Sequence, residues 1–210
     1  MICLSVGKAS KDECLEIIKD ADLAEIRLDL NIYTDEEIEE IFSSDTQLIA
    51  TCREGKYTCD ERKLLLSKAI KAGANYIDIE LTNDYIMIGF IVNTARMSNC
   101  NVIISYHNYE KCPNRENLHD IVNRCFDNNA DIAKVVCKIS AKQENSDIMS
   151  LYNSDKTIIA LGMGNLGKIT RIAAPFLGAP FTYAYPTGRK RTAEGQFSID
   201  KLEDIMKRIS

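Results

Sequence analysis

The chain has 210 residues, 45% of them hydrophobic and 27% charged, which is an ordinary composition for a soluble globular protein. A net charge of −5 leaves no dominant basic surface, so a function in general nucleic-acid binding is not expected. No apolar run approaches the ~20 residues of a membrane span, and the amino-terminal residues do not resemble a signal peptide, so we expect a cytoplasmic protein without a membrane partner.

The cysteines and histidines give no sign of a metal or redox site. The eight cysteines contain no CxxC pair, and several fall in apolar segments, where a reduced thiol behaves as a small hydrophobic group. Only His107 and His119 are present, which excludes a histidine-rich metal site, and His119 falls on a predicted helix surface. We therefore expect no bound metal.

The first half of the chain alternates short apolar segments with amphipathic ones. Strands are predicted at residues 2–7, 23–30, 47–53 and 76–81, where apolar side chains alternate with polar ones or run uninterrupted. Three of the intervening segments open with capping-box spacing, which predicts helix starts. These boxes are Ser10 with Glu13, Thr34 with Glu37, and Thr58 with Glu61. Gly73 is a natural end for the third helix.

The second half repeats the pattern. Strands are predicted at residues 101–108, 131–140, 157–164 and 181–186. Helices are predicted at residues 84–97, from about 115, and at 144–152, 166–176 and 198–209. Eight strands, each followed by a helical segment, predict a parallel α/β sheet with right-handed crossovers. At this length we expect a compact (β/α)8 TIM barrel, with residues 1–210 forming a single catalytic domain.

An open doubly wound sheet is the alternative fold. It would usually carry a glycine-rich turn after its first strand, and VGKAS does not provide one. The sequence GMGNLG at 162–167 looks closer to such a turn, but it comes late in the chain. Its glycines more often ease a tight turn from strand to helix than bind a nucleotide.

Lys134 stands inside the apolar strand 131–140. Alternation places Lys134, Val136 and Lys138 on one face of this strand. The lysine either packs its stem on apolar surface with the ammonium in water, or is buried. Burial would lower the pKa of the amine toward neutrality and make it a nucleophile for a carbonyl group.

The carboxyl ends of the other predicted strands also carry charged or titratable side chains. In a barrel these ends meet at one face, where active sites lie. A self-neutralising ion network would explain the signs of the charges, and Asp78 is expected to pair with an interior arginine. It does not explain a histidine and a lysine on adjacent strands, which favours an active site. The residues are Glu25, Arg27, Arg53, Glu80, His107, Lys134 and Arg171.

Seven separated motifs resemble, in order and spacing, the type I 3-dehydroquinate dehydratases. They are EIRLD, TCREG, YIDIE, ISYHN, DIAKVV, LGMGNLGKITR and TAEGQ, and together they span nearly the whole chain. The resemblance implies a (β/α)8 enzyme of the shikimate pathway without metal or organic cofactor. It also implies that Lys134 forms an imine with the substrate ketone, that His107 is the general acid and base, and that Glu80 orients His107.

The resemblance further implies how the substrate is held. Glu25, Arg27 and Arg53 would contact its hydroxyl groups and polar edge. Arg171 would bind its carboxylate, because a guanidinium forms two parallel hydrogen bonds with that group. Thr192 and Gln196 would belong to the loop that closes the site.

Two departures from the family pattern bear on the loop and on the barrel floor. The family often has Pro where this chain has Glu194, which suggests a more mobile closing loop. Many members also carry a hairpin under the barrel before the first strand, and this chain has no room for it.

The sequence thus predicts syn elimination of water from 3-dehydroquinate to give 3-dehydroshikimate. The alternative enzyme is another imine-forming barrel, a class I aldolase that acts on a phosphorylated sugar, with GMGNLG binding the phosphate. A non-enzymatic alternative is a barrel that binds a small anion and forms no imine. A homodimer through outer helices is compatible with the apolar run 86–91, which a core-facing helix explains equally well.

Overall fold

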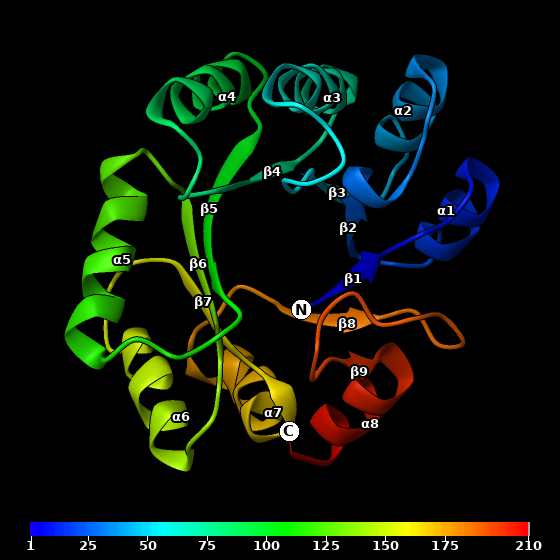
Figure 1. Cartoon of the computed structure of the whole chain (residues 1–210). Coiled ribbons are helices and arrows are strands. Elements are labelled where there is room, and N and C mark those ends of the chain that lie inside the picture. Colours follow the sequence, from blue (N-terminus) through cyan, green and yellow to red (C-terminus); the bar gives the residue numbers. More distant parts are fainter. Residues whose placement is uncertain (210) are drawn as a thin grey trace.

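The protein, described here by a computed structural model for residues 1–209, is one curled sheet surrounded by helices (Figure 1). The strands are β1 Ile2–Val6, β2 Leu23–Arg27, β3 Gln47–Thr51, β4 Tyr76–Glu80, β5 Asn101–Asn108, β6 Ile132–Lys138, β7 Ile158–Met163, β8 Thr182–Tyr185 and β9 Phe197–Ser198. The α-helices are α1 Lys11–Ile18, α2 Asp35–Phe42, α3 Cys59–Ala72, α4 Tyr85–Met97, α5 Arg115–Asp127, α6 Lys142–Met149, α7 Gly164–Ala173 and α8 Ile199–Ile209. Short 3-10 helices follow β2, α6 and α7 at Leu28–Leu30, Ser150–Tyr152 and Ala174–Leu177.

The strand order is β7-β6-β5-β4-β3-β2-β1-β8-β9, and each neighbouring pair is parallel. A helix follows each of the first eight strands, with β9 between β8 and α8, so the prediction of a (β/α)8 barrel is confirmed. Within residues 1–209, no strand pairing joins β7 to β8. Between these two strands, Leu161 of β7 and Phe181, which directly precedes β8, belong to one apolar cluster.

The helix starts follow the predicted capping chemistry. Ser10, Thr34 and Thr58 each accept a hydrogen bond from the backbone N–H of the Glu three residues later, and the carboxylate of that Glu accepts one from the backbone N–H of the cap residue. Gly73 ends α3 with φ of +120°, and a Cβ there would lie 2.8 Å from the carbonyl oxygen of Phe42. The capping boxes fix where α1, α2 and α3 begin, and Gly73 fixes where α3 ends.

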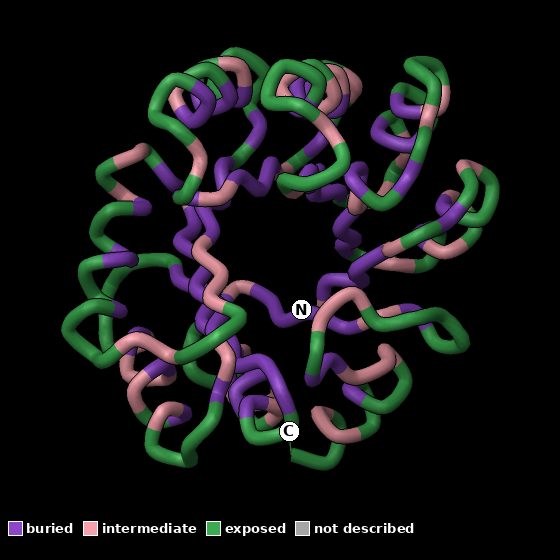
Figure 2. Tube along the Cα trace, in the orientation of Figure 1, coloured by how far each residue is buried: buried purple, intermediate pink, exposed green. Residues whose placement is uncertain are grey.

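Successive side chains of each strand point to opposite faces of the sheet, which gives one apolar layer under the helices and another inside the barrel. Ala133, Val135 and Cys137 of β6 pack outward against the helices, whereas Val136 packs inside the barrel. Figure 2 shows the result, with buried strands surrounding the axis and exposed residues on the outer faces of the helices. Lys134 therefore points into the barrel, as the period of two predicts.

Aromatic rings fill the amino-terminal end of the barrel. Phe181 packs edge-on against Tyr76 and Tyr183, with ring centroids 6.0 and 5.6 Å apart. Phe181 is 2% exposed. These rings pack inside the barrel next to the cavity, which Tyr183 lines.

The second strand is shorter than predicted, and its end has a structural cause. Strand 23–30 ends at Arg27, and Leu28–Leu30 turn into a 3-10 helix. The turn brings Asp29 back onto Arg27, with Arg27 Nε and Nη2 donating to the Asp29 carboxylate at 2.9 and 2.7 Å. The strand therefore ends in a local bidentate ion pair and does not continue its alternation through residues 28–30.

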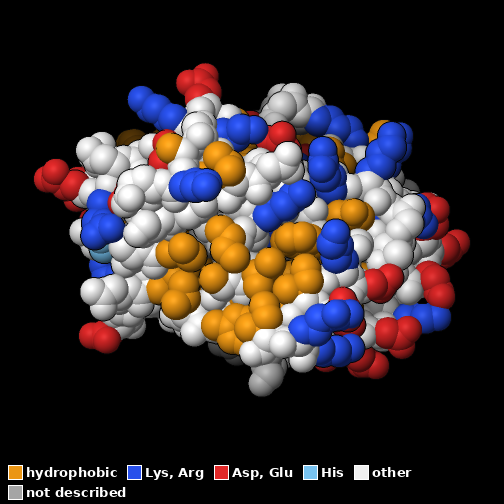
Figure 3. Space-filling model, turned by 90° about the horizontal axis from the view of Figure 1, so that it is seen from below, with side chains coloured by type: hydrophobic (Ala, Val, Ile, Leu, Met, Phe, Trp, Pro, Cys, Tyr) orange, Lys and Arg blue, Asp and Glu red, His pale blue; other side chains and the backbone are white. Residues whose placement is uncertain are grey.

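Several large apolar side chains remain at the surface. Figure 3 shows a cluster of apolar side chains on one face of the molecule. The exposed large apolar side chains of α7 and the following 3-10 helix are Leu166, Ile169, Phe176 and Leu177. On α4, Met87 and Ile91 are buried while Ile86 and Phe90 are exposed, so this helix mainly faces the core. The homodimer stays a prediction. In residues 1–209, no helix combines the length and hydropathy needed to cross a bilayer.

The close approach of β7 and α7 gives a prediction about stability. A Cβ on Gly167 would lie 2.5 Å from the carbonyl carbon of Gly162, so Gly167→Ala must push the helix away from the strand. We expect it to lower the free energy of unfolding by about 1–3 kcal/mol in urea titrations. Gly89→Ala is the matched control, because Gly89 lies inside α4 with nothing within 4 Å of the added Cβ, and should stabilise by about 0.5–1 kcal/mol. Equal effects of the two substitutions would contradict this account.

Candidate active site

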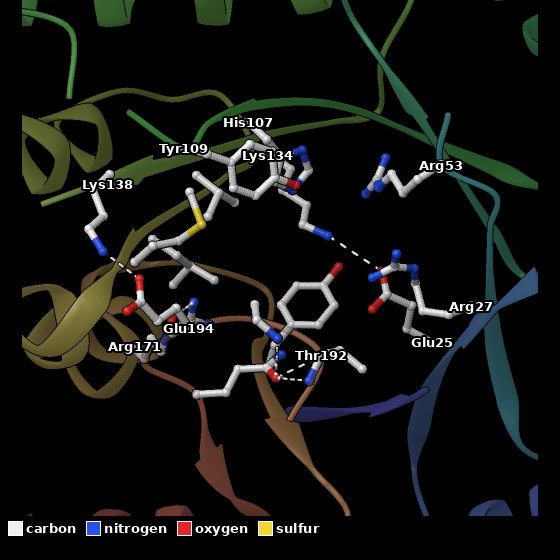
Figure 4. A pocket seen from close by; sticks show the side chains of 16 residues that line it. Glu25, Arg27, Arg53, His107, Tyr109, Lys134, Lys138, Arg171, Thr192 and Glu194 are labelled. Carbon is white, nitrogen blue, oxygen red and sulfur yellow. Dashed lines mark hydrogen bonds and ion pairs between the residues drawn. The ribbon is translucent and has the colours of Figure 1, made fainter. Parts of the chain in front are cut away.

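A cavity of about 220 Å³ opens at the carboxyl ends of the strands (Figure 4). Most of the residues predicted from the sequence line it. They are Glu25, Arg27, Arg53, His107, Lys134, Arg171, Thr192 and Gln196. Glu80 is not among the lining residues and instead contacts His107. The structure therefore gathers side chains from β2, β5 and β6, the loop after β3, α7 and the loop after β8 around one small space.

Lys134 points into this space and is 5% exposed. Its Nζ lies 2.9 Å from Asp78 Oδ2, 3.6 Å from Glu25 Oε1 and 4.1 Å from the ring centroid of Tyr183. Two carboxylates and one aromatic face therefore surround the buried amine.

Asp78 is the anion that connects the buried cations. It accepts hydrogen bonds from Arg53 Nη1 at 2.8 Å, from Ser105 Oγ at 2.6 Å and from Lys134. Burial raises the pKa of Asp78, but Arg53 and Lys134 outweigh that effect and hold it well below its usual range. Asp78 therefore stays ionised, and its predicted pairing with an interior arginine is found, together with a second pairing to Lys134.

His107 is held by Glu80. Its Nδ1 lies 2.9 Å from Glu80 Oε1, and its ring stacks on Tyr109 with centroids 6.1 Å apart. Burial and the charge of Arg53 lower the pKa of His107, while the bond to Glu80 acts in the opposite direction. The imidazole is thus neutral near pH 7. With Nδ1–H donating to Glu80, the lone pair of Nε2 is left available as a base.

Arg171 differs from the other buried cations because no carboxylate faces it in residues 1–209. Its Nη2 donates to the carbonyl oxygen of Glu194 at 3.5 Å, and its Nε has no partner. The side chain is 2% exposed, and burial lowers its pKa to about 10. A buried guanidinium without a counterion on the wall of a cavity favours binding of an anion.

The loop after β8 closes the cavity through short polar contacts. Gln196 Oε1 accepts from Thr192 Oγ1 and the Thr192 backbone, both at 3.0 Å. Thr192 Oγ1 lies 2.8 Å from Ser5 Oγ, which donates to Glu25 at 2.6 Å. On the other side of the cavity, Glu194 forms an ion pair with Lys138 (Figure 4). The loop therefore contacts β1 through Ser5 on one side of the cavity and β6 through Lys138 on the other.

Sequence reasoning missed several parts of the site. Ser5 and Ser105 connect the charged groups, and Tyr183 and Tyr109 line the cavity. The alternation of FTYAYP could have revealed Tyr183, since it shares a face with Phe181. His119, expected at the surface, is exposed. Among residues 1–209, no cluster of three or more His, Cys, Asp or Glu side chains is arranged to hold a metal ion.

Comparison with known proteins gives a consistent result. The family model described as Type I 3-dehydroquinase matches residues 2–210. The 3-dehydroquinate dehydratase of Methanocaldococcus jannaschii is 34% identical over 215 residues, covering 98% of this chain and 97% of that protein.

Solved structures agree in fold. The Aquifex aeolicus 3-dehydroquinate dehydratase superimposes with a TM-score of 0.82 at 25% identity, covering 99% of this chain and 98% of the other. The type I enzyme from Clostridium difficile, solved with a covalently modified comenic acid, gives 0.87 at 24% identity, covering 99% and 91%. With the family model matched along nearly its whole length, this chain belongs to the type I 3-dehydroquinase family, and it is a hydro-lyase.

Proposed function

We propose that the protein dehydrates 3-dehydroquinate to 3-dehydroshikimate by syn elimination through an imine on Lys134. The observation that carries the proposal is the placing of one buried amine and one neutral imidazole on the same cavity wall. The chain's membership of a dehydratase family of the shikimate pathway supports the choice of substrate. We further propose that the enzyme works in the cytoplasm.

The imine makes the elimination feasible. A proton beside a ketone is too weakly acidic for an imidazole to remove quickly, whereas a protonated imine accepts the electron pair and stabilises an enamine. Lys134 supplies the imine nitrogen and His107 removes the proton. The hydroxyl on the neighbouring carbon then leaves as water, taking the proton back from His107. One imidazole can serve both steps because its pKa is already low and it returns to the neutral form.

Lys134 must first lose a proton. Asp78 cannot keep that proton, because Arg53 and Lys134 hold its pKa well below the usual range. His107 is neutral and lines the same cavity, so we assign the deprotonation to its Nε2. The remaining Asp78 charge is still balanced by Arg53 at 2.8 Å. Asp78 therefore keeps a counterion when the free amine is produced.

The other lining residues position the substrate. The free guanidinium of Arg171 binds the carboxylate, and Arg27, Arg53 and Glu25 on the far side of Lys134 face the hydroxyl-bearing edge (Figure 4). Thr192 and Gln196 close the cavity. A phosphorylated sugar is less well supported, because the Gly164 backbone N–H at the start of α7 already donates to the Glu194 carbonyl at 3.4 Å.

The first prediction concerns the covalent intermediate. Borohydride added with 3-dehydroquinate should reduce the imine, and peptide mass mapping should find one adduct, on Lys134. Lys134→Arg keeps a cation beside Asp78 but is not a nucleophile under these conditions, so it should fold, lose turnover and form no adduct. An unmodified Lys134 in a folded, substrate-bound sample would contradict the mechanism and leave an anion-binding barrel as the alternative.

The second prediction concerns pH. Since burial and Arg53 lower the pKa of His107, the acid limb of kcat/KM should lie below pH 6.5. Glu80 raises this pKa through its hydrogen bond, so Glu80→Gln should lower it further and shift the limb to lower pH. Turnover should also fall by about tenfold or more because the imidazole is less basic and less well oriented. Glu110→Gln removes an exposed carboxylate after β5 and serves as control. A limb that shifts to higher pH would refute this assignment.

The third prediction separates binding from stability at Arg171. Removing its guanidinium in Arg171→Met should raise KM by about 10- to 100-fold, the value of a hydrogen bond to a charged group. The same change should not lower the free energy of unfolding, because it removes a buried charge that has no counterion. Arg189→Met, at an exposed arginine paired with Glu13, is the control for both measurements. An unchanged KM would exclude Arg171 from the carboxylate site.

A further inference from the structure

Tyr183 carries a hydroxyl group that the protein itself does not use. The residue is 3% exposed, and its Oη is a buried polar atom without a hydrogen-bond partner. A buried hydroxyl in that state costs about 1–3 kcal/mol. Nearly all such groups in folded proteins have partners, so an exception beside a cavity calls for an explanation.

The location of the unpartnered atoms narrows the explanation. The others in residues 1–209 belong to Ser44, Ser67, Asn145 and Arg171, and of these residues only Arg171 lines the same cavity as Tyr183. Two unsatisfied groups therefore share the cavity. The proposed carboxylate contact satisfies Arg171 and leaves Tyr183 for a second oxygen of the substrate.

The position of the Tyr183 ring identifies that oxygen. Its centroid lies 4.1 Å from Lys134 Nζ, which makes it a direct neighbour of the amine inside the barrel. Its packing is fixed on the other side by Phe181, at 5.6 Å between centroids, and by strand pairing of Tyr183 with Cys3 of β1. When Nζ bonds to the ketone carbon, the ketone oxygen lies two bonds from Nζ. With Arg171 assigned to the carboxylate, the Tyr183 hydroxyl is the remaining unpartnered buried donor among the described residues that line the cavity.

We propose that Tyr183 is a further catalytic residue, whose hydroxyl donates a hydrogen bond to the substrate ketone oxygen while Lys134 attacks the ketone carbon. This inference rests on the proposed imine mechanism and adds to it the group that activates the ketone.

The step balances in atoms and electrons. The amine lone pair forms the N–C bond, and the C=O π pair moves onto oxygen, where Tyr183 stabilises the developing negative charge. The nitrogen then loses one proton and the oxygen gains one, giving a neutral carbinolamine. His107 gives the proton that it took from Lys134 to that oxygen, which leaves as water, and this yields the protonated imine and a neutral imidazole. Tyr183 itself keeps its proton, because burial and the nearby Glu25 raise the pKa of its phenol well above the ordinary value.

The test is Tyr183→Phe, which removes one oxygen and keeps the ring against Lys134. In single-turnover experiments with borohydride trapping, we expect the rate of Lys134 adduct formation to fall about a hundredfold, as for loss of one oxyanion donor. Binding of an analogue with a hydroxyl group in place of the ketone should change less than about threefold. Thermal stability should be unchanged or higher, since an unsatisfied buried hydroxyl is removed.

Tyr76→Phe is the matched control, because Tyr76 also packs on Phe181 but is not among the residues lining the cavity. It should leave the adduct rate within about threefold of the unmodified protein. If the unmodified protein forms the adduct and Tyr183→Phe forms it equally fast, the inference about Tyr183 fails and the imine mechanism stands. If the unmodified protein forms no adduct, the imine mechanism itself fails.

Discussion

The barrel depends on pairing charges in a space that water barely reaches. Asp78 contacts both Arg53 and Lys134 at hydrogen-bond distance, and a serine supplies a third donor. Bringing several charged side chains inside a sheet costs several kcal/mol for each ion unless each has such partners. Asp78 therefore stabilises the fold. It also fixes the position of the amine, because Lys134 Nζ lies 2.9 Å from Asp78 and 3.6 Å from Glu25, which are both buried carboxylates.

The same pairing determines where an anion can bind. Arg27 is neutralised by Asp29, and Arg53 by Asp78, so neither offers a full positive charge to a ligand. Arg171 has only a backbone carbonyl at 3.5 Å. Under the proposed function, the anionic group of the substrate binds on one side of the cavity, opposite Glu25 (Figure 4). The proposed orientation of the substrate relative to Lys134 follows from which cation was left without a counterion.

Much of this arrangement follows from local sequence rules. The period of two placed Glu25, Lys134 and His107 inside the barrel, and the capping residues located the helix starts. The partners of these groups were harder to predict. Asp78 meets Lys134 across a separation of 56 residues, and the turn that returns Asp29 to Arg27 interrupts an alternation that the sequence continues. The missing partner of Tyr183 is a property of packing, because sequence shows that a hydroxyl faces inward but not that nothing meets it.

The glycine-rich segment illustrates how packing decides between two interpretations of one motif. Gly162 and Gly167 allow β7 and α7 to meet, since a Cβ on either would lie 2.5–2.7 Å from the backbone of the other. Gly164 has φ of +81°, and a Cβ on Gly195 of the closing loop would lie 2.7 Å from the Gly164 carbonyl oxygen. Strand, helix and loop therefore approach more closely than side chains would permit. Glu194 stands where the family often has Pro, and it forms an ion pair with Lys138. This part of the loop is therefore held by an ion pair and not by the rigid ring of a proline. The segment that resembled a phosphate-binding turn is already covered by the chain's own loop, so its glycines serve the closure of the site.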